Sequence, residues 1–351
     1  MVQLGRDTMS AETFERAGNR ITGRIVRRVP RTTVVTYTLA LSPAGQPLHL
    51  EYRTRLPDGS LPPNGSESIA VTYRADSAIT ELRRDPPDRR AAAAPAAFPD
   101  IDGSVLFFWL PVNALRMSGS DSMTYLSHAP GNPNAGRTAV ARREVRRYWV
   151  YYFGSPMEIT VDDRGDLQSI DGTRTTFRIT ATRQDIVNLD EIARSFAERE
   201  RAAGPLTVLS PNDSTVAQVG ATHITVRYGR PSARGRAIWS ERGALGDTLW
   251  RTGANAATRL VTTRDLSFGA QLLPAGTYVV TTLAIPGRYQ LIFSAEGREV
   301  LRVPLATRLL EARVEMFTIR VHATGGNADR FVMQWDDRER WADFAVAIAR
   351  N

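Results

Sequence analysis

The 351-residue chain contains no cysteine, and all 45 of its basic side chains are arginine because lysine is absent as well. Without lysine there is no P-loop, no Schiff-base or pyridoxal-phosphate chemistry and no Ser-Lys hydrolase dyad. Without cysteine there is no thiol nucleophile, no disulfide and no cysteine-ligated metal site. These two absences exclude several large classes of enzyme before any motif is considered.

The net charge of +8 is spread along the chain rather than gathered in one block. Arginine outnumbers Asp and Glu by 27 to 24 in residues 1–203 and by 18 to 13 in the remainder. Because no nucleic-acid-binding motif accompanies this excess, nucleic acid is not expected as a partner. The hydrophobic content of 42% and charged content of 23% are ordinary for a globular protein, and the length predicts two domains.

No apolar stretch approaches the ~20 residues that span a bilayer, so no transmembrane segment is expected. The first ten residues show no signal-peptide pattern. The nearest apolar run is Val105–Leu110. Two interpretations stay open for it: a piece of the core, or a docking face for a protein or lipid surface built on Phe107, Phe108 and Trp109.

Residues 1–183 are predicted to form an N-terminal antiparallel β-meander domain. Alternating or Thr-, Val- and Tyr-rich patterns indicate strands at 21–29, 33–41, 48–52 and 69–73. The Pro- and Ala-rich segment 85–99 interrupts the pattern and is predicted to be a surface connection. Tyr148–Phe153 is predicted to be a buried or interfacial strand.

Residues 184–204 are predicted to form a short helix that joins two domains. Asn188 is placed as the N-cap, Glu191 follows three residues later, and Gly204 ends the pattern. Residues 205–351 return to short strands separated by turns, which is typical of a β-sandwich. The predicted fold class is therefore mainly β, with two antiparallel sandwich or meander domains joined by a short helix.

Three ordered segments of the C-terminal half resemble an uncharacterised bacterial domain family. They are Tyr228–Trp239 (Tyr-x-Arg-Pro-Ser…Gly-Arg), Trp250–Thr258 (Trp-Arg-Thr-Gly-Ala-Asn) and Leu273–Tyr278 (Pro-Ala-Gly-Thr-Tyr). The resemblance covers residues 206–348, and the whole chain is similar to exported two-domain proteins of gemmatimonad-type bacteria. The family is a domain of unknown function, so the resemblance implies a fold and a periplasmic or extracytoplasmic, membrane-peripheral location, with no reaction attached.

The chain departs from that family in three places. Arg242–Asp247 replaces the usual Leu-Val-Pro-Tyr-Gly loop, Ala256 stands where many members have Glu, and the stretch near Glu296–Leu301 is shortened. If the family holds a ligand in those loops, these differences favour a structural use of the fold in this chain.

The family-like segments supply the candidate ligand-binding residues of the C-terminal half. One interpretation makes them a polar pocket between loops; the other has them tie loops to backbone carbonyls while Trp239 joins the core. The candidates are Arg230, Arg236, Trp250, Arg251 and Asn255.

The remaining titratable residues do not form a recognisable catalytic or metal-binding pattern. The four histidines are unclustered, and only His128, which follows Ser127 in a polar loop, is a candidate catalytic group. No Gly-x-Ser-x-Gly elbow accompanies it. The carboxylates between Asp162 and Asp171 have the spacing of a hairpin turn rather than a calcium loop. No catalytic residue, metal or cofactor is therefore expected.

The densest basic patch immediately precedes the aromatic strand that contains Tyr151. It consists of Arg142, Arg143, Arg146 and Arg147. On a helix this spacing would place the four side chains on one side, suited to carboxylate or phosphate groups. With Tyr151 they form the candidate docking surface for an acidic protein or a lipid headgroup; an ordinary solvated face is the other interpretation.

These observations favour a non-catalytic interaction or structural protein. Its expected role is a peripheral accessory subunit of a larger extracytoplasmic or membrane-associated assembly, with protein partners and peripheral lipid contact; a photosynthetic reaction-centre and antenna complex is one candidate assembly. A periplasmic small-ligand or carbohydrate-binding protein is the alternative, and an unrecognised hydrolase is the second alternative.

Overall fold

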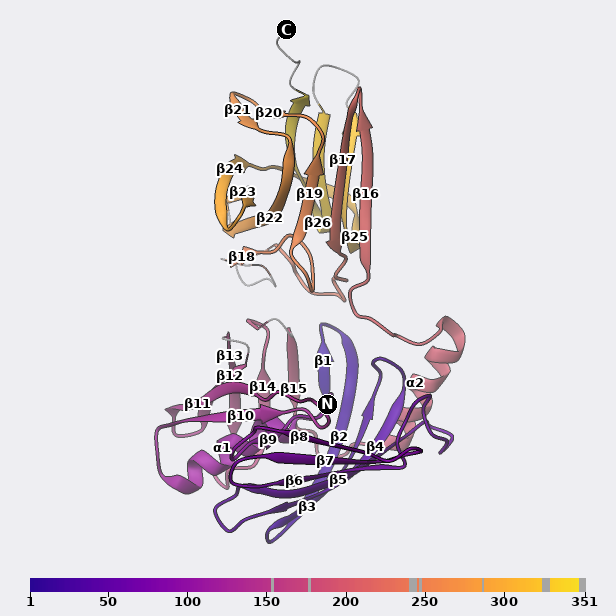
Figure 1. Ribbon diagram of the computed structural model, residues 1–351, viewed down its shortest axis with the longest axis vertical. Helices are drawn as coiled ribbons and strands as arrows, with labels where there is room; N and C mark the ends of the chain where they lie inside the picture. Colours follow the sequence, from indigo (N-terminus) through magenta and orange to yellow (C-terminus); the bar gives the residue numbers. More distant parts are fainter. Residues whose placement is uncertain are drawn as a thin grey trace. The chain divides into compact units, whose positions relative to one another are not determined.

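The computed structural model describes residues 1–152, 155–175, 178–239, 245, 248–285, 287–323 and 329–346. It divides into two compact units, Met1–Thr207 and Val208–Asn351, which we call unit 1 and unit 2. Both are built mainly from antiparallel strands (Figure 1). The predicted mainly-β fold class is thus confirmed.

Unit 1 contains one 15-stranded sheet with the order β8-β7-β6-β5-β4-β3-β2-β1-β15-β14-β13-β12-β11-β10-β9. The chain begins in the middle of this sheet, because β1 pairs with both β2 and β15. It meanders out to β8, crosses to β9 and returns through β10 to β15. The bounds are β1 Val2–Leu4, β2 Asp7–Ala17, β3 Arg20–Arg27, β4 Thr33–Leu41, β5 Pro47–Arg55, β6 Ser68–Tyr73, β7 Ala78–Arg83, β8 Asp88–Ala92, β9 Phe98–Pro99, β10 Ser122–His128, β11 Gly136–Glu144, β12 Arg147–Tyr152, β13 Ser155–Val161, β14 Leu167–Asp171 and β15 Ile179–Thr182.

The sheet curves until its two edges are joined by one short segment (Figure 1). β8 ends at Ala92 and β9 begins at Phe98, so the segment between them spans at most about 20 Å. Two hydrogen bonds also connect the halves: the Gly131 N–H donates to Thr80 Oγ1 at 3.1 Å, and Arg90 Nη1 donates to the Gly131 carbonyl at 3.2 Å. The curved sheet therefore encloses a core.

The prediction of a plain surface connection at 85–99 is wrong, because this segment holds both edge strands. Ala92, Ala94, Ala97 and Phe98 are buried. Small alanine side chains fit where the two sheet edges approach, yet they carry little hydrophobic signal, and the prolines hide the strand alternation. The strands before residue 20, β1 and β2, were also not predicted.

Helix α1 (Leu106–Ser118) packs inside the curve and contacts both halves of the sheet. The Phe107 ring lies 5.9 Å from the ring of Tyr37 on β4, and Trp109 Nε1 donates to the Gly165 carbonyl at 2.8 Å. Phe107 and Trp109 are 6% and 4% exposed, so the docking face predicted for them is wrong. Phe108 is half-buried against the same core. The apolar run Val105–Leu110 is therefore a piece of the core, which is the first of its two interpretations.

Helix α2 (Leu189–Ala203) confirms the helix predicted from its cap. Asn188 Oδ1 accepts from the Glu191 N–H at 3.1 Å. Its apolar face packs against Ala11 on β2 and Val26 on β3, through Leu189, Ala193 and Phe196. The helix is thus part of unit 1. Across the described ranges, neither helix has the length and apolarity that crossing a bilayer requires.

Unit 2 packs a seven-stranded sheet and a four-stranded sheet around one hydrophobic cluster, as in a β-sandwich. Some adjacent strands of the first sheet pair as hairpins; Leu291, for example, pairs with Val303. The first sheet holds β16 Asn212–Val219, β17 Thr222–Gly229, β18 Thr248–Trp250, β19 Thr258–Thr262, β22 Gly276–Ile285, β23 Arg288–Ala295 and β24 Arg298–Pro304, and the second holds β20 Leu266–Phe268, β21 Gln271–Leu273, β25 Ala306–Ala323 and β26 Asp329–Val346.

Candidate functional site

The four predicted arginines lie on the hairpin between β11 and β12 rather than on a helix. β11 ends at Glu144 and β12 begins at Arg147. The pairing register shifts between Arg142 and Glu144. Because successive strand residues point to opposite faces and the irregularity falls among the arginines, they do not share one face.

Arg143 belongs to the face that points away from the core. Its guanidinium carbon lies 3.7 Å from the centroid of the Trp149 ring, and its Nη2 donates to Tyr151 Oη at 3.3 Å. The two rings meet in a T-shaped contact at 6.1 Å. Tyr148 and Val150, which alternate with them along β12, are buried. The outer face therefore carries an arginine stacked on an aromatic pair.

The tip of the hairpin is exposed and charged. Val145 is 83% exposed. Arg146 lies 3.2 Å from Asp163, and Arg147 lies 3.6 Å from Glu144. Exposed ion pairs contribute only about 0–1 kcal/mol, so both arginines can exchange these carboxylates for those of a partner. We call the side chains of Arg143, Val145, Arg146, Arg147, Trp149 and Tyr151 the hairpin surface.

Arg142 is separated from this surface. It pairs in register with the buried Tyr148. Its Nη1 lies 3.7 Å from Asp121, and its Nη2 donates to the Ser120 carbonyl at 3.4 Å. Arg142 therefore ties β11 to the segment before β10, and the predicted group of four arginines is reduced to three.

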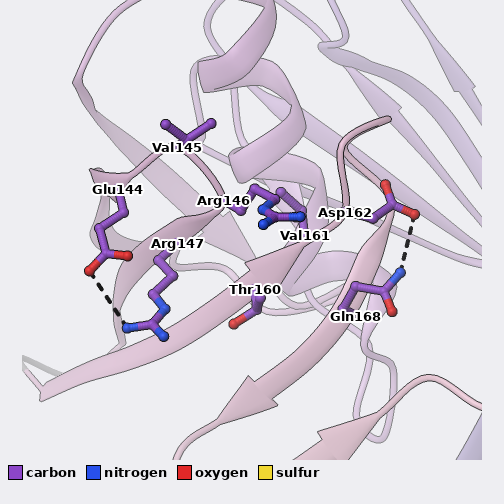
Figure 2. A pocket seen from close by; sticks show the side chains of 8 residues that line it. All are labelled: Glu144, Val145, Arg146, Arg147, Thr160, Val161, Asp162 and Gln168. Atoms are coloured by element: carbon purple, nitrogen blue, oxygen red, sulfur yellow. Dashed lines mark hydrogen bonds and ion pairs between the residues drawn. The ribbon is translucent and has the colours of Figure 1, made fainter.

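An open groove of about 630 Å³ borders the hairpin surface. Figure 2 shows its lining, which comes from the hairpin and from β13 and β14. Gln168 Nε2 donates to Asp162 Oδ2 at 3.1 Å. The backbone N–H of Asp166, which donates to the same carboxylate, lowers the pKa of Asp162 below its usual value, so Asp162 stays ionised at neutral pH. The groove thus offers a polar wall beside the arginines.

The candidate arginines of unit 2 form hydrogen bonds and an ion pair with other residues of unit 2. Arg230 donates to the Phe317 carbonyl and to Thr318 Oγ1, each at 3.1 Å, and its Nη1 lies 3.1 Å from Asp213. Arg236 donates to the carbonyls of two residues that precede it in the same loop, at 2.6 and 2.9 Å. These contacts fasten the segment after β17 to β25.

The other three candidates are engaged in the same way. Arg251 donates to the Asn255 carbonyl, and Asn255 Nδ2 donates to the Ser210 carbonyl at 3.0 Å. Trp250 is 8% exposed, donates from Nε1 to the Gly253 carbonyl at 2.8 Å, and stacks on a core ring, that of Trp335. The geometry matches the structural interpretation of these motifs. The family departure at Arg242–Asp247 lies, except for Leu245, outside the described residues.

Two residues outside the predicted site residues carry cation–π contacts: Trp149 on the hairpin surface, and Arg340 in the core of unit 2. Arg340 is 2% exposed, and its guanidinium carbon lies 3.9 Å from the ring centroid of Trp239 and 3.7 Å from that of Tyr289. Burial lowers its pKa to about 10. The alternation of β26 could have indicated that Arg340 points inward. Only the fold shows that its guanidinium group forms cation–π contacts with aromatic rings.

His128 does not form a catalytic pair with its neighbour. Its side chain is buried, its Nε2 lies 3.1 Å from the Asn132 carbonyl, and its ring meets that of Tyr73 edge-on. Burial lowers the pKa of His128. Ser127 instead donates to Asp100 at 3.3 Å. Within the described part of the chain, no group of three or more His, Asp or Glu side chains is placed to hold a metal ion.

The comparison with protein families finds a match for the part of unit 2 that contains the motifs. Residues 210–343 match the family described as "Protein of unknown function (DUF2911)". This confirms the resemblance of the C-terminal half to an uncharacterised domain family. The DUF2911 region holds all five candidate ligand-binding residues, so the motifs that define the resemblance are the ones that fasten its loops.

Other comparisons are distant. One similar solved structure is a crystal structure of a DUF1089 family protein from Pseudomonas aeruginosa, with 12% sequence identity and a TM-score of 0.34. The match covers 46% of this chain and 89% of that chain. No curated protein has a significant sequence match to this chain.

Proposed function

We propose that this protein acts by binding rather than by catalysis, as a peripheral accessory subunit of a membrane-associated, extracytoplasmic assembly. The hairpin surface of unit 1 is the proposed contact, and an acidic protein surface is its proposed partner. The observation that carries the proposal is Arg143, stacked 3.7 Å over Trp149 and forming no ion pair with any described acidic residue.

The chemistry of this surface supports a protein partner. Trp, Tyr and Arg are the residues that most often dominate the binding energy of protein interfaces. Arg143 uses one guanidinium face on Trp149 and one nitrogen on Tyr151, which leaves further N–H groups for a carboxylate.

A protein partner fits better than a lipid surface. The aromatic rings lie beneath Arg143 instead of projecting outward, and Val145 is the single apolar side chain at the hairpin tip. A membrane-inserting surface needs a larger protruding apolar area. Asp163 and Glu144, beside the arginines, would also weaken attraction to an anionic bilayer.

The test is recovery of the tagged full chain from native membranes in mild detergent at low salt, followed by size-exclusion chromatography. The wild type is expected to elute with a fixed set of partner subunits, and Arg143→Glu as a free monomer. Arg330→Glu is the control for the same charge reversal in unit 2, where Arg330 also lies over a tryptophan, Trp341, at 4.8 Å, but pairs with Asp343 at 2.7 Å. The co-eluting subunits would identify the assembly, photosynthetic or otherwise.

Three outcomes contradict the proposal. Wild-type protein recovered only as a free monomer would remove the subunit role. Equal loss with the Arg330→Glu variant would show a nonspecific charge effect. Sedimentation with phosphatidylglycerol vesicles that depends on Arg143, without co-eluting subunits, would replace the protein partner with lipid.

A further inference from the structure

A second candidate site lies in unit 1, between helix α1 and strands β2, β14 and β15. It is a cavity of about 490 Å³, within the range of about 300–1,000 Å³ typical of small-molecule sites. Trp109 and Asn113 line it from one face of α1, and Val105, the N-cap residue of the helix, continues the same four-residue spacing. Phe14 on β2 closes the aromatic wall, with its ring centroid 6.1 Å from that of Trp109. We call this space the α1 cavity.

Asn113 is a polar side chain in the middle of helix α1, with apolar residues on both sides of it in the sequence. It is only 9% exposed, and the one hydrogen bond that its amide makes within the described residues is to the sulfur of Met117 at 3.6 Å. A thioether is a weak acceptor, whereas an amide has two donors and one strong acceptor. Leaving such a group unpaired in a core costs about 1–3 kcal/mol. The amide is therefore free to bind a ligand in the cavity.

The mouth of the cavity carries arginines whose guanidinium groups can still bind a carboxylate. Arg164 and Arg16 line it, and neither forms an ion pair within the described part of the chain. Arg183 lies 3.6 Å from Asp162 and 3.9 Å from Asp166, which are long ion pairs.

The acidic groups of the cavity do not cancel these charges. Glu12 accepts hydrogen bonds from Tyr37, from Ser104 and from the N–H groups of Val105 and Leu106, so its carboxylate is fully occupied. Asp166 faces Arg183, and Asp185 is the remaining acidic lining residue. Two unpaired guanidinium groups thus face one unpaired carboxylate.

We infer that the α1 cavity binds a small hydroxyaryl carboxylate. Its aromatic body packs against Phe14 and Trp109, its hydroxyl group pairs with the Asn113 amide, and its carboxylate lies at the arginine-lined mouth near Arg164. The ring pair of Phe14 and Trp109, the buried Asn113 amide and the exposed Arg164 match the three groups of such a ligand. The site is independent of the hairpin surface and of any partner subunit.

Isothermal titration calorimetry of the full chain tests the inference with two probes, 6-hydroxy-2-naphthoate and 2-naphthoate. The hydroxylated probe is expected to bind about tenfold more tightly to the wild type. Asn113→Leu should remove this preference, because leucine fills the position without the amide. Arg164→Gln should weaken both probes about tenfold. Arg194→Gln, an exposed arginine of α2 outside the cavity, is the matched control and should change neither.

Each result decides for or against the inference. Absence of binding, or binding that saturates only at millimolar probe, overturns it. Equal affinity of the wild type for the two probes removes the role of Asn113, and tighter binding of decanoate than of either naphthoate removes the aromatic class. If Asn113→Leu does not fold, the effect of Arg164→Gln on both probes and the probe preference of the wild type still decide.

Discussion

The candidate binding residues of unit 1 and unit 2 differ in how their polar groups are used. In unit 2, polar side chains of the family motifs form hydrogen bonds with the unit's own backbone: Arg230, Arg251 and Asn255 each donate to a main-chain carbonyl. In unit 1, which lies outside the DUF2911 match, Arg143 and Asn113 keep hydrogen-bonding capacity that the described fold does not use. A recognisable motif can therefore mark what a fold needs, while a binding surface lies where no motif is seen.

The contrast is tested most strongly by removing one tryptophan from each unit. Trp250→Ala is expected to destabilise unit 2 by about 3–5 kcal/mol, because it removes a buried ring stacked 5.6 Å from Trp335. Trp149→Thr on the hairpin surface should cost about 1 kcal/mol, since the lost contact is a stack of the half-buried Trp149 with the exposed Arg143. Hydrogen exchange followed by mass spectrometry, read separately on the peptides of each unit, measures both effects.

A comparable cost for the two variants would contradict the contrast. It would show that Trp149 is a core residue of unit 1, and the hairpin surface would then be structural. The two variants should also differ in binding to the partner subunits. Trp149→Thr is expected to lose this binding, and Trp250→Ala is expected to keep it at temperatures where unit 2 stays folded.

A second prediction concerns Glu12, the residue of unit 1 that most resembles the motif residues of unit 2. Its carboxylate accepts from Tyr37, from Ser104 and from the first N–H groups of α1, so it fixes the helix beside the α1 cavity. Glu12→Ala leaves these donors unpaired and should cost about 2–3 kcal/mol. Urea denaturation at neutral pH measures this cost.

The pH dependence of the same residue has a definite sign. Burial raises the pKa of Glu12 above its ordinary value, so the folded state holds the proton more tightly than the unfolded chain does. Its contribution to stability is then fully present below the ordinary pKa of glutamate and is lost as the pH rises through the raised value. The stability difference between wild type and Glu12→Gln should therefore shift against the wild type between acid and neutral pH. A difference that does not change with pH would show that Glu12 is not buried from solvent.

The sequence could predict those elements whose evidence is local. The cap at Asn188 and the Thr-, Val- and Tyr-rich composition of residues 33–41 each lie within one element, and both predictions are confirmed. Helix α1 has no such signal, because it is buried on most sides and contains Pro111, so its apolar run lacks a helical period. The pairing of Val2 with Ala181 at the centre of the sheet joins residues too far apart for any local pattern.

The candidate site was predictable in composition but not in geometry. The basic and aromatic residues near Tyr151 were found, yet their grouping depends on the register shift between Arg142 and Glu144, which sends Arg142 away from the others. Trp149 became part of the site only because Arg143 stacks on it from the neighbouring strand. Cross-strand contacts of this kind follow from pairing, which residue order alone does not specify.

The smallest expected effect comes from Arg251 in the most conspicuous motif of unit 2. Its side chain is exposed and donates to the Asn255 carbonyl within the same loop. Arg251→Ala should cost about 0.5–1.5 kcal/mol, measured by thermal denaturation of the full chain. It should leave both naphthoate binding and recovery with the partner subunits unchanged, whereas Arg143→Glu loses the subunits. If Arg251→Ala loses either kind of binding while its fold stays intact, the functional site lies in unit 2 and the motif that contains Arg251 binds a ligand.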